Sequence, residues 1–182
     1  MRRSELILSI IKANGGEIQG KTTMQKLSYF CSLKPIVTDL LVFRPHYYGP
    51  YSAQVDFELD KLTMLGFLSE TSRATINSRI IHDFSLRSEG VKISESVARQ
   101  YADEYERIRA IVSTCKDQVG LNPTTLSYAA KVHYILSRNK PLITHSQVIR
   151  EAKRIGWKLN KENVQSGAAL LIALKLAKSS GS

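Results

Sequence analysis

The sequence predicts a mainly α-helical protein with a small β-hairpin, and therefore an α+β fold. Most of the chain carries apolar residues at the three-to-four-residue spacing of helices that bury one face. Two strand signals adjoin each other, from Phe67 to Ser72 and from Thr75 to Leu86, and the second alternates apolar and polar residues. Gly and Pro residues fall where the helical patterns stop. Together these observations predict helices that pack around one hairpin.

The first predicted helix covers residues 4–14, with Ser4 as its N-cap and Gly15 as its C-cap. The second covers residues 23–33 and ends before Pro35, because a proline disfavours helical geometry in the residue that precedes it. Each helix carries an apolar face, made of Leu6, Ile7, Ile10 and Ile11 in the first and of Met24, Leu27, Phe30 and Cys31 in the second.

The segment between these helices, Gly15 to Thr22, reads GGEIQGKT and satisfies the G-x-x-x-x-G-K-[ST] pattern of phosphate-binding loops. Such a loop requires a buried strand that runs directly into it, whereas the residues before Gly15 are predicted to be helical. The sequence therefore favours a helix-to-helix turn in which Thr22 or Thr23 caps the second helix. Nucleotide binding at residues 15–22 is the enzymatic alternative, and no catalytic residues are otherwise expected.

A corner and a third helix follow. Residues 36–43 are predicted to be either a short strand or a helical turn, and the sequence FRPHYYGPYS after them predicts a sharp corner. The third helix is expected from Ala53 to Leu65, capped by Ser52 and stopped by Gly66. Its apolar face consists of Val55, Leu59, Leu62 and Leu65.

Residues 72–74 form the predicted tip of the hairpin between the two strands, and a long helix is expected over residues 91–119. This helix carries a near-heptad apolar stripe, which predicts a rod of roughly 35–40 Å that pairs with a second helix. A homodimer through residues 91–119 would provide that partner. The stripe consists of Val97, Tyr101, Tyr105, Ile108, Val112, Cys115 and Val119.

A boundary is predicted at Gly120 to Pro123, and three helical segments follow it, over residues 124–139, 144–155 and 161–178. The last segment is apolar nearly all round, so it is expected to be a buried central helix. The chain then divides into residues 1–90, a connecting helix over residues 91–119 and a basic helical domain over residues 120–182.

The order of three helices, a two-stranded hairpin and a long helix resembles a winged helix. The third helix leaves through Leu65-Gly66-Phe67-Leu68, and the second strand leaves through Phe84-Ser85-Leu86-Arg87-Ser88-Glu89-Gly90. This is similar to the strand, Leu-Thr-x-x-Gly, helix exit of multiple-antibiotic-resistance-type and phenolic-acid-type winged-helix regulators, with Arg87 in place of the usual Thr. In those families the following long helix dimerises, which the resemblance implies here for residues 91–119.

A narrower resemblance covers residues 20–68, about a quarter of the chain. Gly20-Lys21-Thr22, Gln25-Lys26-Leu27, Phe30, His46-Tyr47-Tyr48-Gly49-Pro50-Tyr51-Ser52 and Leu65-Gly66 resemble a group of prokaryotic winged-helix proteins. They are also distantly similar to the Panacea antitoxin domain, with its K-L-Q-K-L-x-Y-F and Y-G-P elements. Such proteins act in regulation, toxin neutralisation and phage defence, so the resemblance implies a fold more firmly than a function.

The charge of the chain is concentrated near its end. The whole chain has 26 Lys and Arg against 16 Asp and Glu, and residues 120–182 hold 10 of the former and 2 of the latter. A basic surface of this kind favours a polyanion such as nucleic acid, although basic residues also solvate helix faces. The two cysteines lack partners at metal-ligand spacing and no signal peptide is evident, which predicts a cytoplasmic protein without a metal or cofactor.

The predicted nucleic-acid site lies in the basic region rather than on the third helix. The polar positions of the third helix, Gln54, Asp56, Glu58, Asp60 and Lys61, sum to −2, so that helix would repel phosphates in the usual winged-helix docking. The spacing of residues 150, 153 and 154 instead puts three cations on one helix face. The expected DNA contacts are Gln147, Arg150, Lys153, Arg154, Lys158 and Lys161, with Arg73 and Arg79 on the hairpin.

The corner and the third helix form a second candidate surface. Its aromatic and cationic side chains could stack bases or form a protein hot spot, although the pattern favours tyrosines that wedge the corner into the core. The leading hypothesis is a DNA-binding regulator or defence accessory without enzymatic activity, and the alternative is an antitoxin-like module that binds a partner protein. The expected partner-binding residues are Arg44, His46, Tyr47, Tyr48, Tyr51 and Asp56.

Overall fold

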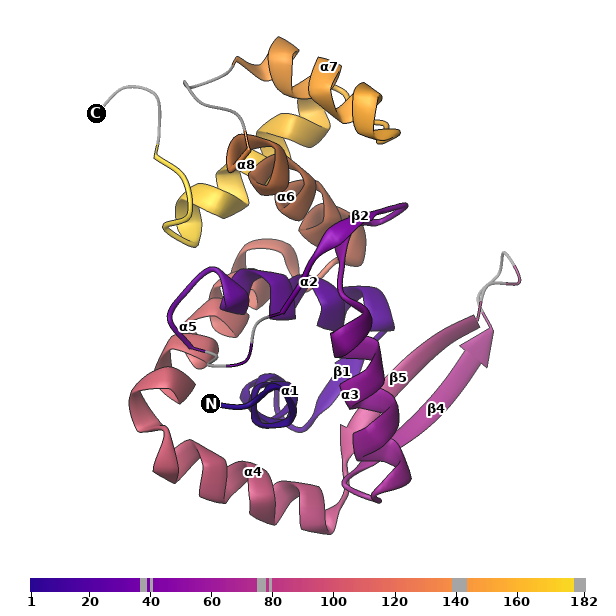
Figure 1. Cartoon of the computed structure of the whole chain (residues 1–182), viewed down its shortest axis with the longest axis vertical. Coiled ribbons are helices and arrows are strands. Elements are labelled where there is room, and N and C mark those ends of the chain that lie inside the picture. Colours follow the sequence, from indigo (N-terminus) through magenta and orange to yellow (C-terminus); the bar gives the residue numbers. More distant parts are fainter. Residues whose placement is uncertain (37–38, 40, 75–77, 79, 139–143, 179–182) are drawn as a thin grey trace. The chain divides into compact units, whose positions relative to one another are not determined.

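The computed structural model describes the chain except for residues 37–38, 40, 75–77, 79, 139–143 and 179–182. The described residues form eight helices and five strands in small antiparallel sheets, so the predicted mainly helical α+β fold is confirmed (Figure 1). The chain divides into two compact units, which do not follow the three-part division expected from the sequence. The N-terminal unit comprises Met1–Phe43 and Ser52–Ser113, and the C-terminal unit comprises Arg44–Tyr51 and Thr114–Ser182.

The N-terminal unit begins with helices α1 (Arg3–Ala13), α2 (Lys21–Ser32) and α3 (Ala53–Met64), close to their predicted bounds. Both α2 and α3 pack against α1. The expected apolar faces of α1 and α2 are buried. Ser4 does not cap α1, because the helix starts one residue earlier and the Ser4 hydroxyl donates a 2.7 Å hydrogen bond to Glu58.

A three-stranded antiparallel sheet completes this unit, formed by β1 (Glu17–Gln19), β4 (Leu68–Ala74) and β5 (Ile80–Leu86) in the order β1-β5-β4. The sequence did not predict β1, which lies where a direct helix-to-helix turn was expected. A strand of three residues with one apolar side chain, Ile18, is too short to show periodicity. Ile18 pairs with Phe84, and both side chains are buried.

The predicted hairpin tip at residues 72–74 is wrong, because Ser72, Arg73 and Ala74 all pair with β5. Polar contacts between β4 and β5 stabilise the part of the hairpin that lies beyond its apolar side chains. The Arg73 guanidinium lies 2.6 Å from Asp83, and His82 Nδ1 lies 2.6 Å from Glu70. Side chains of this type give no alternating hydrophobic signal, so the sequence pattern ended the first strand too early.

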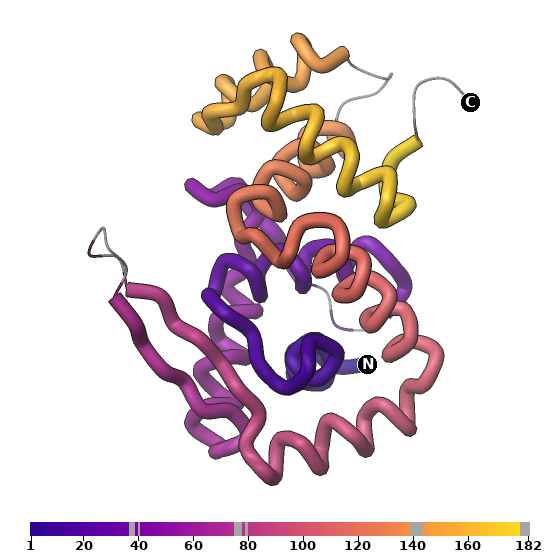
Figure 2. Tube along the Cα trace, turned by 180° about the vertical axis from the view of Figure 1, so that it is seen from behind, coloured from indigo at the N-terminus to yellow at the C-terminus, as the bar shows by residue number. Residues whose placement is uncertain are grey.

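The predicted single helix over residues 91–119 is also wrong. The backbone turns at Tyr101, with φ −121° and ψ 55°, and this residue separates α4 (Ser88–Gln100) from α5 (Ala102–Val119). Figure 2 shows these two helices passing around α1 rather than forming a straight rod. Val97, Ile108 and Val112 from the predicted stripe are buried within the chain, so the apolar seam expected to pair with a second copy is already covered.

The C-terminal unit contains the short hairpin of β2 (Arg44–His46) and β3 (Gly49–Tyr51), and the helices α6 (Pro123–Leu136), α7 (His145–Ile155) and α8 (Lys161–Ala173). Helix α6 packs against both α7 and α8, and β3 packs against α6. Where α6 meets α8, a Cβ on Gly167 would lie 2.9 Å from the carbonyl carbon of Tyr128, so glycine permits a close approach of the two helices.

The expectation that the last helix is buried all round is wrong. Helix α8 ends at Ala173 and buries one face, whereas Gln165, Ser166 and Ala169 are exposed. Alanine counts as apolar in the sequence pattern but has little surface to bury, so a run rich in alanine overstates burial. The buried face consists of Val164, Gly167, Leu170 and Leu171.

Both α7 and α8 begin with a capping interaction. The Thr144 hydroxyl accepts a hydrogen bond from the Gln147 amide at 3.3 Å, and the Gln147 side chain accepts one from the Thr144 amide at 2.6 Å. Gly156 ends α7 with φ +85°, and the Asn160 side chain caps α8. The turn between the two helices is therefore fixed at both ends.

Candidate nucleic-acid interface

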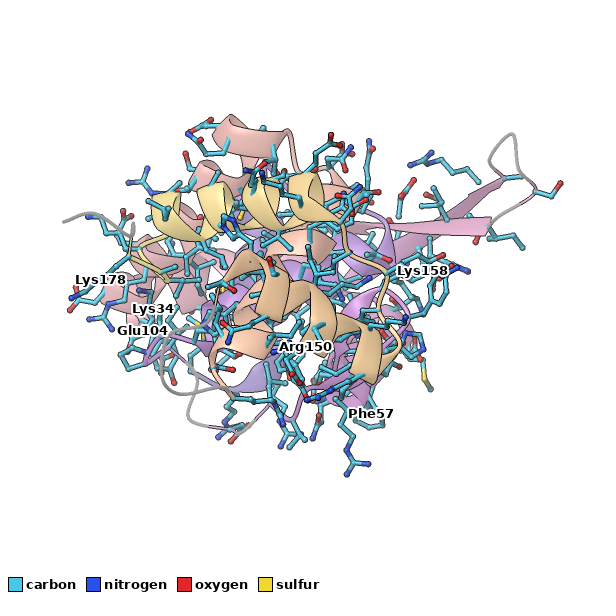
Figure 3. All side chains as sticks on the ribbon, turned by 90° about the horizontal axis from the view of Figure 1, so that it is seen from above. Lys34, Phe57, Glu104, Arg150, Lys158 and Lys178 are labelled. Atoms are coloured by element: carbon cyan, nitrogen blue, oxygen red, sulfur yellow. The ribbon has the colours of Figure 1, made fainter. Side chains whose placement is uncertain are left out.

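Helix α7 presents three basic side chains on the face opposite its buried residues. Val148 and Ala152 are buried, whereas Arg150, Lys153 and Arg154 are exposed, as the predicted spacing requires. Arg154 pairs with Glu151 at 2.8 Å. Arg150 and Lys153 have no carboxylate partner among the described residues. The charges of Arg150 and Lys153 are therefore available to an external anion. Figure 3 labels Arg150 on this helix.

Two more exposed lysines, Lys158 and Lys161, lie at the turn between α7 and α8. Neither lysine side chain has a hydrogen bond or ion pair to a described residue. Lys161 opens α8, where the helix dipole disfavours a positive charge, so folding of the helix gives no reason for a cation there. Both side chains extend the basic surface of α7 past its C-terminal end, where Figure 3 labels Lys158.

The β2–β3 hairpin is anchored at this same turn. The indole Nε1 of Trp157 donates a 2.7 Å hydrogen bond to the carbonyl oxygen of His46. Trp157 is buried, and its ring packs edge to face on Tyr134 with centroids 5.5 Å apart. Figures 1 and 2 both show the end of the hairpin beside the turn between α7 and α8. The corner segment and the basic helix thus belong to one unit.

A buried lysine lies beneath the hairpin. Gly49 has φ +97°, and a Cβ there would lie 3.1 Å from Cγ of Lys131, so a glycine allows the strand to rest on this side chain. Lys131 Nζ lies 5.7 Å from the centroid of the Trp157 ring. Burial lowers the pKa of the Lys131 ammonium. Neither Lys131 nor Trp157 was expected at the site, because their contacts with the hairpin join residues far apart in the sequence.

Two tyrosines form the tip of the hairpin. The register pairs His46 with Gly49 and leaves Tyr47 and Tyr48 as the connecting residues. Tyr47 is 74% exposed and Tyr48 is 41% exposed. Their rings lie edge to face, with centroids 4.8 Å apart and an interplanar angle of 85°. Tyr51 is less exposed and packs beside the His46 ring at 5.0 Å.

The charge of the two units differs strongly. The C-terminal unit, including the hairpin with its exposed Arg44, holds 12 Lys and Arg against 3 Asp and Glu, a net charge of +9. The N-terminal unit holds the remaining 14 and 13, a net charge of +1. The structure thus places the predicted aromatic corner and the predicted basic helix, assigned separately from the sequence, in one strongly basic unit.

Other predicted site residues lie in the N-terminal unit. Arg73 is paired with Asp83, as described above, and Arg79 lies outside the described residues. The Asp56 carboxylate accepts a 2.8 Å hydrogen bond from Gln25, whose amide nitrogen also donates to the Ser52 carbonyl at 2.9 Å. Asp56 therefore stabilises the start of α3.

The Gly15–Thr22 segment uses its polar groups within the N-terminal unit. The Gly20 amide donates to the Asp83 carboxylate at 2.9 Å, and Lys21 Nζ lies 3.6 Å from Asp60. Helix α1 precedes the segment. Strand β1 lies within the segment and pairs antiparallel with β5. This geometry differs from a phosphate-binding loop, in which a strand leads directly into converging backbone amides.

Helix α3 exposes a group of apolar residues that the sequence analysis missed. Phe57 is 64% exposed, Met64 87% and Leu65 58%, although Leu65 was expected in the core. The helix ends at Met64, so Leu65 falls at the C-cap and leaves the buried stripe. The adjacent carboxylate of Glu58 is buried and paired with Lys61 at 3.0 Å. An exposed apolar group of this kind is suited to contact with a protein.

Within the described part of the chain, no helix combines the length and apolar character needed to cross a membrane. The same residues contain no cluster of three His, Cys, Asp or Glu side chains that could hold a metal ion. No protein-family model and no curated protein matches this sequence.

Proposed function

We propose that this protein binds nucleic acid through the basic face of its C-terminal unit, as a DNA-binding regulator or defence accessory. The observation that carries the proposal is the exposed row of cations on α7, in which Arg150 and Lys153 lack a carboxylate partner among the described residues. Exposed cations held on a rigid helix attract phosphates and release counterions when they bind. The net charge of +9 on this unit acts in the same direction.

We further propose that the N-terminal unit is a winged helix. The order α1-β1-α2-α3-β4-β5 supports this proposal, because three helices are followed by a hairpin that joins a three-stranded sheet. The acidic groups of α3 and its exposed Phe57 and Met64 are poorly suited to a phosphate-lined groove. Nucleic acid is therefore assigned to α7 and the turn that follows it.

Charge reversal on α7 tests the assignment. The triple variant Arg150→Glu/Lys153→Glu/Arg154→Glu is compared with wild type in binding to a mixed-sequence duplex over a range of salt concentrations. We expect the variant to lose binding at 0.1 M salt, because three phosphate contacts are replaced by repulsion. In wild type each contact contributes about −0.9 to the slope of log K against log salt, so the three should account for roughly −2.7.

A matched control keeps the same change in net charge within the same unit. Lys116, Lys175 and Lys178 are exposed residues outside α7 and its following turn, and the variant Lys116→Glu/Lys175→Glu/Lys178→Glu should bind close to wild type. Equal losses in the two triple variants would show that only the total charge matters and would remove the site from α7. Equal, salt-insensitive binding by wild type and the α7 variant would reject the proposed interface.

The second candidate function is an antitoxin-like module that binds a partner protein, and the exposed apolar residues of α3 favour it. Phe57 and Met64 lie on the exposed side of this helix, seven residues apart and thus two turns from each other. A partner that co-purifies from the native host should be lost with Phe57→Ser/Met64→Ser and retained with Tyr47→Ala. Retention by both variants would exclude α3 as the contact.

A further inference from the structure

At the tip of the β2–β3 hairpin, Tyr47 contributes little burial to the folded unit. Tyr47 leaves most of its ring in solvent, and its described ring contact is with the neighbouring Tyr48. Burying a tyrosine contributes to stability through the apolar area removed from water, and Tyr47 removes little of it. A polar residue would serve a two-residue turn equally well, so the exposed ring calls for a functional explanation.

The base of the hairpin holds these tyrosines in a defined position. The Trp157 indole is bonded to the His46 carbonyl at 2.7 Å, and His46 directly precedes Tyr47. On the other strand, Gly49 directly follows Tyr48 and rests on the Lys131 side chain. Both connections to the tip are thus fixed by contacts with the α6–α8 helices. A ring presented on a fixed backbone loses little conformational entropy when it binds.

Basic groups surround the same location. Lys158 follows Trp157 in the sequence, so the Cα atoms of the two residues lie about 3.8 Å apart. Trp157 is the residue bonded to the hairpin. Arg44 is exposed on β2, and its side chain has no hydrogen bond or ion pair to a described residue. Helix α7, with Arg150 and Lys153, leads into this turn. An aromatic face beside a track of cations is the arrangement with which proteins bind unpaired nucleotides.

Paired bases are not suitable ligands for such a ring. Within a continuous duplex, each base face is covered by its neighbours in the stack, and a tyrosine can reach a face only where the stack is interrupted. Unpaired bases in a single-stranded extension offer free faces, and their phosphates can still contact the basic residues. The tip therefore fits the point where a duplex ends and a single strand begins.

We propose that Tyr47 stacks on an unpaired base and that Tyr48, edge-on to it, positions its ring. The preferred ligand is then a duplex with a single-stranded extension, in which α7 contacts the duplex phosphates and the hairpin tip contacts the extension. This inference rests on the proposed nucleic-acid binding by the C-terminal unit, and it adds the class of ligand. Tyr47 carries the larger share because it is the more exposed of the two rings.

Three fluorescent probes separate stacking from charge. They are a blunt duplex, the same duplex with an eight-nucleotide thymidine extension, and that duplex with an eight-unit abasic extension. The last two carry the same number of phosphates, so their affinities differ only through the bases. We expect the thymidine probe to bind full-length protein about tenfold more tightly than the abasic probe, as one stacked base contributes on this scale.

Substitutions at the tip identify the ring responsible. Tyr47→Ala should abolish the tenfold difference between the thymidine and abasic probes and leave blunt-duplex binding unchanged. Tyr47→Phe should keep the difference, because stacking requires the ring and not the hydroxyl. Tyr48→Ala should reduce the difference without abolishing it. An unchanged circular dichroism spectrum and melting temperature verify that each variant is folded.

The outcomes separate the two proposals. Equal binding of the thymidine and abasic probes by wild type, with salt-dependent binding of both, overturns the stacking inference and leaves the α7 interface intact. A difference that survives Tyr47→Ala also overturns it. If none of the three probes shows salt-dependent binding, the proposal of nucleic-acid binding is rejected. The exposed tyrosines would then be assigned to contact with a protein.

Discussion

Five basic side chains of the N-terminal unit, such as Arg73 and Lys92, have a carboxylate partner, whereas on α7 of the C-terminal unit Arg154 has one and Arg150 and Lys153 have none among the described residues. Arg73 lies 2.6 Å from Asp83, and Lys92 lies 2.6 Å from Glu89. In contrast, Arg150 has no such partner among the described residues. A cation that already has a local counter-charge gains less from an external phosphate. Arg73 and Lys92 on one side and Arg150 and Lys153 on the other therefore test whether local pairing or total charge decides phosphate binding.

Matched charge reversals in the two units test most directly whether paired and unpaired cations differ in binding. Arg73→Glu/Lys92→Glu in the N-terminal unit and Arg150→Glu/Lys153→Glu in the C-terminal unit change the net charge by the same amount. We expect the second pair to weaken binding of a duplex about 100-fold at 0.1 M salt, since two phosphate contacts become repulsive. The first pair should change binding less than threefold, although repulsion between the introduced carboxylate and Asp83 would lower stability. Fluorescence anisotropy with one labelled duplex measures both effects on binding.

An equal loss of binding in the two variants would show that phosphates respond to the charge of the whole chain. A larger loss in the N-terminal variant would move the interface to the β4–β5 hairpin. Thermal melts of both proteins separate lost binding from lost folding.

The two units also differ in how their hairpins are held. The β4–β5 hairpin carries polar cross-strand pairs, such as Ser69 with Ser85 at 2.7 Å. The β2–β3 hairpin has three residues in each strand and depends on contacts with the helices beneath it. A two-stranded hairpin of this size is not stable in water without such packing.

Replacing Trp157 by phenylalanine would measure how much the indole hydrogen bond contributes to holding the β2–β3 hairpin. Trp157→Phe keeps an aromatic ring beside Tyr134 but removes the hydrogen bond to the His46 carbonyl. We expect a loss of about 1 kcal/mol in the free energy of unfolding, the usual contribution of one such bond. Urea denaturation followed by circular dichroism measures it. Ser69→Ala on the other hairpin should cost less, because its partner Ser85 is only partly buried and can bond to water.

If Trp157→Phe left stability unchanged and also kept the preference for the thymidine probe, the indole bond would not be what positions the hairpin tip. The packing of Gly49 on Lys131 would then be the remaining anchor.

The sequence predicted several helices closely, because each of these buries a face with a period that can be read from apolar residues. Helices α1, α2, α3 and α7 lie within two residues of their predicted bounds. The break at Tyr101 was not visible, since the apolar stripe continues through it at helical spacing. A stripe records which residues are buried but not whether the helix remains straight.

The composition of the candidate site could be predicted, but its assembly could not. The exposed cations of α7 follow from helical spacing alone, and the tyrosine-rich corner was evident from its letters. One contact that joins them within a unit is the bond between Trp157 and His46, which are 111 positions apart. No local pattern encodes such a contact. The corner was therefore predicted to share a surface with the acidic α3, which is next to it in the chain, and not with α7.

The histidines provide the smallest expected effect and a final contrast between the units. His82 on β5 lies beside Glu70, whereas His133 on α6 is half-buried and burial lowers its pKa below the ordinary value of 6.5. In the unfolded chain His133 regains its ordinary pKa, so below about pH 6.5 the unfolded state takes up a proton that the folded state resists. Stability of the C-terminal unit should therefore fall as the pH drops from 7.5 to 5.5.

Fluorescence of Trp157, the single tryptophan of the chain, reports on this unit and can follow its urea denaturation at the two pH values. His133→Gln should reduce the shift in midpoint between them, because glutamine does not titrate. His82→Gln should leave the Trp157 transition close to that of wild type, since His82 belongs to the N-terminal unit. An identical shift in wild type and His133→Gln would show that a group other than His133 carries the pH dependence between pH 7.5 and 5.5.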